Sequence, residues 1–390
     1  MSNDIEWKMV KLGNVCQIKD GTHQTPHYVE NGKQFYSVEN VTNNDFSHTK
    51  YISESEHKKL TATYRIEKGD VLMTRIGSIG VCKYIDWDVD ASFYVSLALL
   101  KCNKTFINPR YFVFYSQTKQ FREEILSHSL QFAIPMKINL GKISDVLISI
   151  PYKNGSPDLE TQKQIAQKLG DMDSLIAAKE KLLAKKRNLK VAAMQKLIKD
   201  EEGENWKKVK IGDYLRVKTG SKNTEDKMDD GKYPLYVRSP IVERINEYTH
   251  DCEAVLTAGD GVGTGKVFHY VNGKFAAHQR VYVISNFTEI DGKYFYYQFS
   301  QNFYDEVMKY TAKSSVDSVR RGMITGMEIA LPFYSDGSPD LIEQRRIASI
   351  LSDMDSEISA IEKEITKLQN LKTAMMQKMF CFGDSDSSSE

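Results

Sequence analysis

The sequence is poor in the features that would place it in a simple class. Its 390 residues include five cysteines and no CxxC pair, so neither a zinc site nor a dithiol motif is indicated. No apolar run approaches the roughly 18 residues of a membrane span, and the first residues lack a signal-peptide core. The formal net charge is +1, so any nucleic-acid surface must be a local patch. We therefore expect a cytoplasmic protein with reduced thiols and, at this length, two or more domains.

A recognisable catalytic centre is also missing. The string NPRY from Asn108 is similar to the Asn-Pro-Pro-Tyr loop of amino-methyltransferases, but it lacks the second proline, and Asn-Pro also caps helices. The Gly-rich string GDGVGTGK from Gly259 departs from a Walker motif at two positions, which favours a hairpin turn. Asp158 and Asp340 open long helices, where capping is a better account than nuclease chemistry. The eight histidines form no readable triad or ligand cluster, so we predict neither catalytic residues nor a metal site.

The sequence contains a long internal repeat. The stretch from Gly155 to Lys196 returns from Gly337 to Lys378, and about 25 of the 42 aligned positions are identical. A second pair of strings opens each half, WKMVKLG from Trp7 and WKKVKIG from Trp206. The segments between these anchors have diverged. A duplication in which the anchor strings are retained and the segments between them have diverged indicates one scaffold that carries two different binding domains.

Each repeat predicts a helix of about 40 residues, roughly 60 Å long. Ser156 and Ser338 are expected to cap the two helices, with the following prolines in the first turn. Apolar residues then recur at alternating spacings of three and four, and because helices this long cannot bury such a stripe against a small domain, we expect them to pack on each other. The predicted packing positions are Ile165, Leu169, Met172, Ile176, Leu183, Ile347, Leu351, Met354, Ile358, Ile361, Ile365 and Leu368.

Charge predicts the direction of this packing. Both copies carry acids early, such as Asp173 and Asp355, and bases late, such as Lys190 and Lys372. Antiparallel helices would pair each acidic start with a basic end, whereas parallel helices would set like charges together. The same pattern also suits each helix dipole, so it favours antiparallel packing without requiring it.

The segments between the anchors predict a mixed α/β domain of about 130–150 residues in each half. The first half reads as strand, Gly-rich turn and strand from Gly69, then a buried strand from Tyr94, an amphipathic helix from Asn108 and an exit strand ending at Pro151. The second half repeats this order. The expected fold class is α+β, with two globular domains separated by two long helices that pack as an antiparallel coiled coil with pseudo-two-fold symmetry.

Donor side chains in the predicted loops are the remaining functional candidates. Arg and Gln make bidentate contacts to base edges, and Lys and Ser contact phosphates. One such residue alone is more often a solvated surface residue, but two clusters in matching domains are more persuasive. The DNA-contact candidates are Lys33, Arg75, Ser78, Lys83, Arg238, Ser239, Lys266, His278, Gln279, Arg280, Lys313, Arg320 and Arg321.

Taken together, these strings resemble the specificity (S) subunits of type I restriction-modification systems. The resemblance covers nearly the whole chain and rests on WKxVK[LI]G, DGTHQTP, GDVLMTRIGSIG and, most specifically, the repeated SPDL...QxxIAxxL...MD. It implies two target-recognition domains that each read one half of a split DNA site, held apart by antiparallel helices. It also implies that this chain has no catalytic residue and binds no cofactor, because partner subunits use S-adenosylmethionine for adenine methylation and ATP and Mg for translocation and cleavage.

The resemblance implies double-stranded DNA, two modification subunits and restriction subunits as partners, and no membrane. Leu175, Leu182 and Leu189 lie outside the helix-packing stripe, so we predict that they receive helices of the modification subunits.

The expected domain division is 1–150 and 206–330 for the two target-recognition domains, 151–205 and 331–380 for the helical regions, and 381–390 for a disordered tail. Two alternatives stay open at this point. One is a catalytic DNA adenine methyltransferase that uses the NPRY string, and the other is a coiled-coil scaffold that binds only protein.

Overall fold

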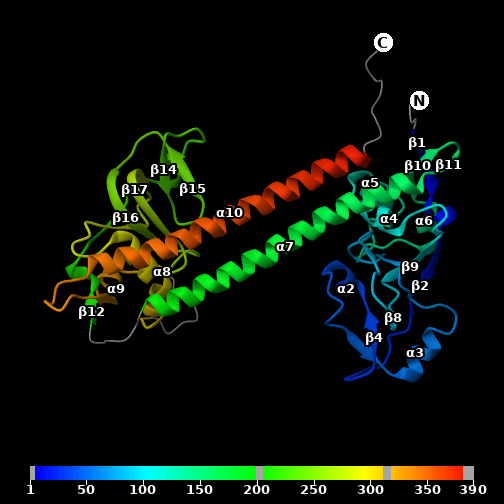
Figure 1. Cartoon of the computed structure of the whole chain (residues 1–390), viewed down its shortest axis with the longest axis horizontal. Helices are drawn as coiled ribbons and strands as arrows, with labels where there is room; N and C mark the ends of the chain where they lie inside the picture. Colours follow the sequence, from blue (N-terminus) through cyan, green and yellow to red (C-terminus); the bar gives the residue numbers. More distant parts are fainter. Residues whose placement is uncertain (1–4, 199–204, 311–317, 381–390) are drawn as a thin grey trace, which may run out of the picture. The chain divides into compact units, whose positions relative to one another are not determined.

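The chain divides into two compact units. The computed structural model describes residues 5–198, 205–310 and 318–380. The first unit takes in residues 1–179 and 364–390, and the second takes in residues 180–363. Each unit therefore combines one globular domain with one part of each long helix, which Figure 1 colours green and orange to red. Lys313, Cys381 and the predicted tail lie outside the described residues.

Within residues 5–158, the globular part of the first unit contains three small sheets. The order β2-β9-β6-β7 forms an antiparallel sheet, β3-β5-β4-β8 forms a second with β4 and β8 parallel, and β1-β10-β11 forms a third. β6 is buried along its length and β9 over its first four residues, which explains their nearly continuous apolar sequences. The strands are β1 (Glu6–Lys11), β2 (Cys16–Asp20), β3 (Tyr28–Val29), β4 (Lys33–Tyr36), β5 (Lys50–Ile52), β6 (Val71–Thr74), β7 (Cys82–Tyr84), β8 (Ala91–Phe93), β9 (Leu97–Cys102), β10 (Leu147–Lys153) and β11 (Ser156–Pro157).

The helices of this globular part are short. The sequence predicts one amphipathic helix from Asn108, but the structure has two, α4 and α5. The break occurs because Thr118 starts a new helix, its hydroxyl accepting a hydrogen bond from the Phe121 amide at 3.2 Å. The helices are α1 (Leu12–Val15), α2 (Val38–Thr42), α3 (Glu54–Leu60), α4 (Pro109–Tyr115), α5 (Lys119–Ser127) and α6 (Leu140–Asp145).

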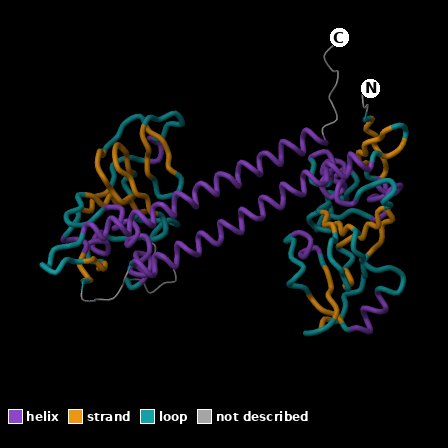
Figure 2. The backbone as a smooth tube through the Cα atoms, viewed as in Figure 1, coloured by secondary structure: helices purple, strands orange, loops and turns teal. Residues whose placement is uncertain are grey.

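In the described residues of the second unit, the globular part has one larger sheet with the order β13-β18-β16-β17-β14-β15, and a separate pair β12-β19. The counterpart of α4 and α5 is here one continuous helix of 17 residues, α8. Figure 2 shows these strands and helices as orange and purple tube. The elements are β12 (Trp206–Lys210), η1 (Ile211–Asp213), β13 (Arg216–Thr219), η2 (Thr224–Asp226), β14 (Tyr233–Tyr236), β15 (Val242–Ile245), β16 (His250–Ala258), β17 (Phe268–Ala277), β18 (Val281–Ser285), α8 (Gly292–Met308), α9 (Arg321–Thr325) and β19 (Glu328–Pro332).

The two predicted long helices are present as α7 (Leu159–Leu197) and α10 (Leu341–Phe380). The prediction that Ser156 and Ser338 cap them is wrong, because the chain is still extended there and both helices begin later. The caps are the aspartates: Asp158 Oδ1 accepts from the Thr161 amide at 3.1 Å, and Asp340 Oδ1 accepts from the Glu343 amide at 2.9 Å. Among the described residues, no helix is both long and apolar enough to cross a membrane.

Ion pairs show that the two helices run antiparallel within each unit. In the first unit Lys372 lies 2.6 Å from Asp173, and in the second Lys190 pairs with Asp355. These are the same interaction made twice, since both residues of one pair are the sequence-repeat counterparts of the other pair. Each partly exposed pair contributes about 0.2–1 kcal/mol at most, so the pairs set direction more than stability. The predicted antiparallel coil is confirmed.

The predicted packing positions lie along the protected side of both helices. The buried ones are Ile165, Leu169, Ile176, Ile347, Leu351, Ile361 and Ile365, and the half-buried ones are Met172, Leu183, Met354, Ile358 and Leu368. Near the helix ends the stripe also joins a domain core: Ile165 and Leu169 pack with Phe380 in the first unit, and Ile347 and Leu351 pack with Ile198 in the second. Each globular domain is thus fixed to the start of one long helix and the end of the other.

Candidate nucleic-acid interface

In the first unit, the Gly-rich turn after β6 brings Arg75 inside the protein. Arg75 is 8% exposed, and its guanidinium donates to Asp20 Oδ2 at 3.1 Å, to the Val95 carbonyl at 2.7 Å and to the Ile138 carbonyl at 3.2 Å. These contacts connect the end of β2, the residues just before β9 and the segment before α6 to one turn. Arg75 therefore has a structural role, and its predicted contact with DNA stays a prediction.

The other first-half candidates lie at different places. Ser78 is exposed at the tip of the same turn, between Gly77 and Gly80, which both have positive φ. Lys83 lies on β7, the second strand of this hairpin, with its ammonium 5.7 Å from the centre of the Trp87 ring. Lys33 belongs to another sheet, where its Nζ contacts Asp90 Oδ2 at 2.5 Å. The structure thus brings Ser78 and Lys83 to one hairpin and leaves Lys33 apart.

In the second unit, the corresponding turn gathers two arginines on one carboxylate. Arg238 Nη1 lies 2.8 Å from Asp260 Oδ1, and Arg280 Nη1 lies 3.4 Å from Asp260 Oδ2. The two arginine side chains remain 47% and 64% exposed. Gly261 leaves room beside them, because a Cβ added there would still lie 3.8 Å from Arg238 Nη1. Two cations held by one anion keep a net positive charge, so this pair is oriented and still able to bind a further acceptor.

His278 is buried next to this pair and is hydrogen-bonded to the backbone of Arg280. It is 7% exposed, and its Nδ1 accepts a hydrogen bond from the Arg280 amide at 2.9 Å. Burial, followed by the charge of Arg238, lowers the pKa of His278. The neutral imidazole is therefore favoured, which is the form that has a ring nitrogen free to accept. Its neighbour Gln279 is exposed and donates to Asn223 Oδ1 at 2.7 Å.

The remaining second-half candidates are more dispersed. The Ser239 hydroxyl is used by the backbone of Ile241 at 3.2 Å. Lys266 is exposed and lies 5.6 Å from the ring centre of Tyr304. Arg320 and Arg321 are exposed at the start of α9. Arg238, His278, Gln279 and Arg280 are thus the candidates that the structure brings together in this domain.

Sequence reasoning missed the residue that organises this group. In the sequence, Asp260 is one of the two positions at which GDGVGTGK departs from a Walker motif, whereas in the structure it pairs with two arginines. Its position between two glycines was the available signal, because such a residue lies on a tight turn with its side chain accessible. The partners Arg238 and Arg280 come from other loops, so no local pattern connects them to it.

Sequence reasoning also missed a duplicated joint between each domain and its long helix. Gln162 is fully buried; its Oε1 accepts from the Asn108 amide at 2.8 Å and its Nε2 donates to the Phe106 carbonyl at 3.1 Å. Gln344, its repeat counterpart, is equally buried and does the same with the Asp291 amide at 2.9 Å and the Glu289 carbonyl at 3.3 Å. We call these two sites the glutamine joints. Their identity in both repeats was the signal that could have found them.

The glutamine joints also explain the NPRY string. Asn108 Oδ1 accepts from the amides of Arg110 at 2.9 Å and Tyr111 at 3.3 Å, so Asn108 is the cap of α4. The Tyr111 ring is fully buried, and its hydroxyl donates to the Ser149 carbonyl at 2.8 Å. In the second unit Tyr294 makes the equivalent bond to the Ala330 carbonyl at 2.8 Å. The string is therefore one copy of a repeated structural element.

A second contact between domain and helix differs slightly in the two units. Lys372, which pairs with Asp173, lies 5.5 Å from the ring centre of Phe114, and Lys190, which pairs with Asp355, lies 5.4 Å from that of Tyr297. The Tyr297 hydroxyl adds a bond to Asp355 Oδ2 at 2.8 Å that a phenylalanine cannot make.

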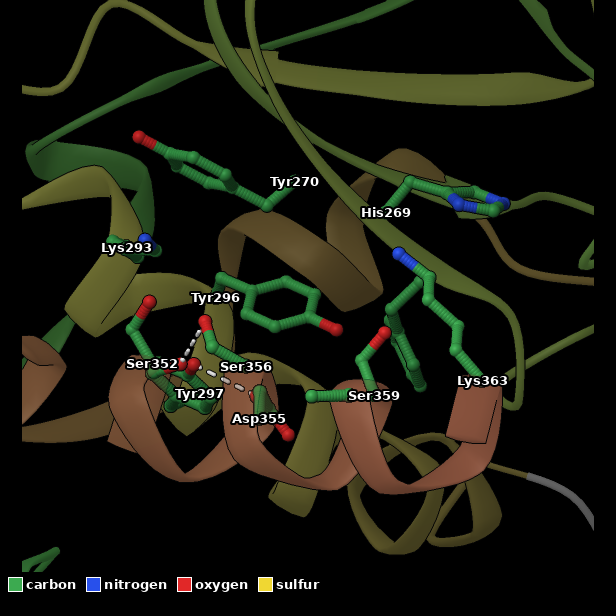
Figure 3. A pocket seen from close by; sticks show the side chains of 12 residues that line it. His269, Tyr270, Lys293, Tyr296, Tyr297, Ser352, Asp355, Ser356, Ser359 and Lys363 are labelled. Atoms are coloured by element: carbon green, nitrogen blue, oxygen red, sulfur yellow. Dashed lines mark hydrogen bonds between the residues drawn. The ribbon is translucent and has the colours of Figure 1, made fainter. Parts of the chain in front are cut away.

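The Tyr297 contact lines an open cleft of about 580 Å³ between β17, α8 and α10 (Figure 3). Tyr270, Tyr296 and Lys293 line its domain side. On the helix side, Lys363 rises from α10 toward His269 (Figure 3). Within the described ranges, no three His, Cys, Asp or Glu side chains are grouped so that they could hold a metal ion.

Both halves of the duplication match the same protein family. The family model of the type I restriction modification DNA specificity domain matches residues 4–185 and again residues 203–371. The chain belongs to this family. The two matches coincide with the two halves of the duplication, and each ends inside a long helix. The family is defined by DNA specificity, and the match is not to a methyltransferase or nuclease domain.

Individual relatives agree with this assignment. The specificity subunit of the type I restriction enzyme EcoDI of Escherichia coli is 28% identical over 178 residues, which are 46% of this chain and 37% of that protein. The chain thus spans well under half of that relative's length. A putative type I restriction enzyme specificity subunit of Methanocaldococcus jannaschii, MjaX, is 23% identical over 95% of this chain and 92% of its own length. The crystal structure of the S subunit from M. genitalium has the same fold, with a TM-score of 0.69, 15% identity and 98% of both chains covered.

Proposed function

We propose that this chain is the non-catalytic DNA-specificity subunit of a type I restriction-modification complex. The observation that carries the proposal is that the DNA specificity domain occurs twice on a duplicated frame, while the loops on that frame differ. Each globular domain, residues 1–150 and 206–330, reads one half of a bipartite site. Because the loops differ, the two half-sites differ in sequence. The helical regions, 151–205 and 331–380, set the distance between the half-sites.

The second domain reads its half-site with the Arg238, Asp260 and Arg280 group. An arginine held in place by a carboxylate loses little side-chain freedom on binding, and its second edge can contact guanine O6 and N7 or a phosphate. Gln279 on the same edge suits an adenine. In the first domain the exposed Ser78 and the half-exposed Lys83 on the Gly-rich hairpin are the better candidates, since Arg75 is used inside the protein.

The partners follow from the helices. Leu175, Leu182 and Leu189 are spaced by seven residues along α7 and are 43%, 37% and 46% exposed. A stripe of this kind suits an amphipathic helix of a partner. We propose that modification subunits, two in each complex, dock there, that restriction subunits join them in the cytoplasm, and that these partners bind S-adenosylmethionine, ATP and Mg.

Neither alternative is favoured. A methyltransferase that uses the NPRY string would need Tyr111 at an open surface, whereas Tyr111 is buried and bonded to the exit strand β10. A scaffold that binds only protein would not explain why the match is to a DNA specificity domain in both halves.

Reconstitution with the modification subunits tests the proposal. The chain alone should not methylate DNA, whereas the complex should methylate adenines in one asymmetric bipartite motif, with half-site centres about one helical turn, roughly 10–12 base pairs, apart. Mapping of methylated adenines in the source genome gives the motif independently. A continuous motif, or methylation by the chain alone, would contradict the proposal.

A further inference from the structure

Two large apolar side chains of the first unit stand fully in solvent. Phe132 and Ile134 are 101% and 100% exposed, at the tip of the loop between α5 and α6. An isolated, half-exposed apolar residue is ordinary, but two neighbouring ones with no protein contact mark an interaction site.

The base of this loop is firmly built. The Leu130 amide donates to the Lys137 carbonyl at 2.8 Å, which closes the loop on itself. The Gly77 amide donates to the Met136 carbonyl at 2.8 Å, and the Ile138 amide donates to the Arg75 carbonyl at 3.0 Å. The loop is therefore attached to the Gly-rich turn that carries Ser78, and its position relative to that turn is fixed.

The charge around the tip indicates the kind of partner. The loop from Gln131 to Ile138 contains no Asp or Glu, and it contains Lys137. Lys137 is exposed at the base of the loop. The loop itself therefore carries no negative charge, and Lys137 is available for a phosphate of a polyanion.

We propose that Phe132 and Ile134 insert into duplex DNA at the half-site of the first domain, against an opened base step. Apolar wedges of this kind, Phe and Ile among them, unstack neighbouring base pairs in other DNA-binding proteins. A methyltransferase that acts on a base must take it out of the stack, so a wedge beside the target lowers the cost of that step. This inference rests on the proposed function, because it needs the first domain to lie on DNA.

The second domain carries a smaller exposed apolar group at its own Gly-rich turn, the counterpart of the turn that carries Ser78. Val262, which lies between Gly261 and Gly263, is 99% exposed beside the Arg238 and Arg280 pair. A valine covers less of a base than a phenylalanine does. We assign the wedge to the first half-site, where Phe132 and Ile134 lie.

The test uses the full complex with modification subunits and DNA that carries the mapped site. The double variant Phe132→Ala/Ile134→Ala is compared with Ile342→Ala, which removes an aliphatic side chain that is 72% exposed on α10 of the second unit. 2-Aminopurine is placed in turn at each position of the first half-site and its flanks. The wild-type complex should raise fluorescence at one step, and the double variant should lose that signal and bind about tenfold more weakly, as expected when one stacked aromatic contact is removed. Ile342→Ala should match the wild type in both measurements.

Three results would overturn the inference. In one, the double variant keeps both the fluorescence and the affinity. In another, p-benzoylphenylalanine at position 132 crosslinks to a modification subunit instead of DNA. In the third, the double variant fails to assemble with its partners. The wild-type complex reports on the proposed function separately, because it must still methylate the bipartite site in every one of these cases.

Discussion

In both units the same contacts attach the globular domain to the long helices, but the loops near the Gly-rich turn differ. Gln162 and Gln344 make the same two hydrogen bonds, and Asp173 and Asp355 make the same ion pair with the opposite helix. At the Gly-rich turn the units diverge. The first turns Arg75 inward onto Asp20, whereas the second turns Arg238 and Arg280 outward around Asp260.

Two groups of residues are therefore constrained differently: those that attach each domain to the long helices, which we call the frame, and the exposed residues near the turn. A residue of the frame has buried partners on another element, so its replacement leaves a donor or acceptor without a partner. An exposed residue at or beside the turn, such as Ser78 or Arg280, faces solvent or DNA, so its replacement changes what is bound and leaves the fold intact. The comparison predicts that frame variants have matching effects in both units and that turn variants affect one half-site only.

The largest effect is expected at the glutamine joints. Gln162→Met and Gln344→Met each leave one buried amide and one buried carbonyl without a partner, so each should lower the free energy of unfolding by about 2–4 kcal/mol. Urea denaturation measures this, with the exposed Gln195→Met as the control. A large loss at one joint and none at the other would break the equivalence of the two units.

The next effect is expected at the arginine pair. Arg280→Ala should reduce discrimination at the second half-site by about 1–3 kcal/mol and leave the preference at the first half-site unchanged. Binding of the reconstituted complex to singly mutated sites measures both. If both half-sites lost specificity, Arg280 would act on the structure of the whole subunit and not on the reading of one half-site.

A smaller effect is expected where the frame itself differs. Tyr297→Phe makes the second unit resemble the first, which has Phe114 at this position, and removes the hydroxyl bond to Asp355. We expect a loss of about 1 kcal/mol in unfolding free energy, because the tyrosine hydroxyl loses a bond to a charged group that is partly open to solvent. Thermal and urea unfolding of the variant check this, and a loss as large as that at the glutamine joints would show that the cleft contact is the main attachment.

The smallest effect is a pH dependence in the second unit. Burial is the main cause that lowers the pKa values of His250, His269 and His278, so the folded protein favours their neutral forms. The unfolded chain takes up these protons first as the pH falls through about 6.5, so stability is present above that pH and declines below it. His278→Asn keeps an acceptor for the Arg280 amide and should reduce the decline in unfolding free energy between pH 7.5 and 5.5. An unchanged pH profile would show that His278 does not contribute.

Sequence reasoning reached the parts of the structure that depend on local pattern or on repetition. Sequence reasoning predicted the long helices, their antiparallel charge pattern and the Gly-rich hairpins, because each depends on a pattern within one continuous segment. Sequence reasoning offered both Ser156 and Asp158 as caps of the same helix, and only the extended β11 decides for Asp158. The Asp260 group and the glutamine joints were missed because their partners lie far away in sequence, as Gln162 does from Asn108.

Exchange of the second domain tests the central claim most directly. Residues 206–330 are replaced by the same domain of another family member, with both long helices retained, and the methylated motif of the reconstituted complex is mapped. The two-domain account predicts a new second half-site, an unchanged first half-site and an unchanged spacer. A change in both half-sites, or a motif identical to that of the original complex, would contradict it.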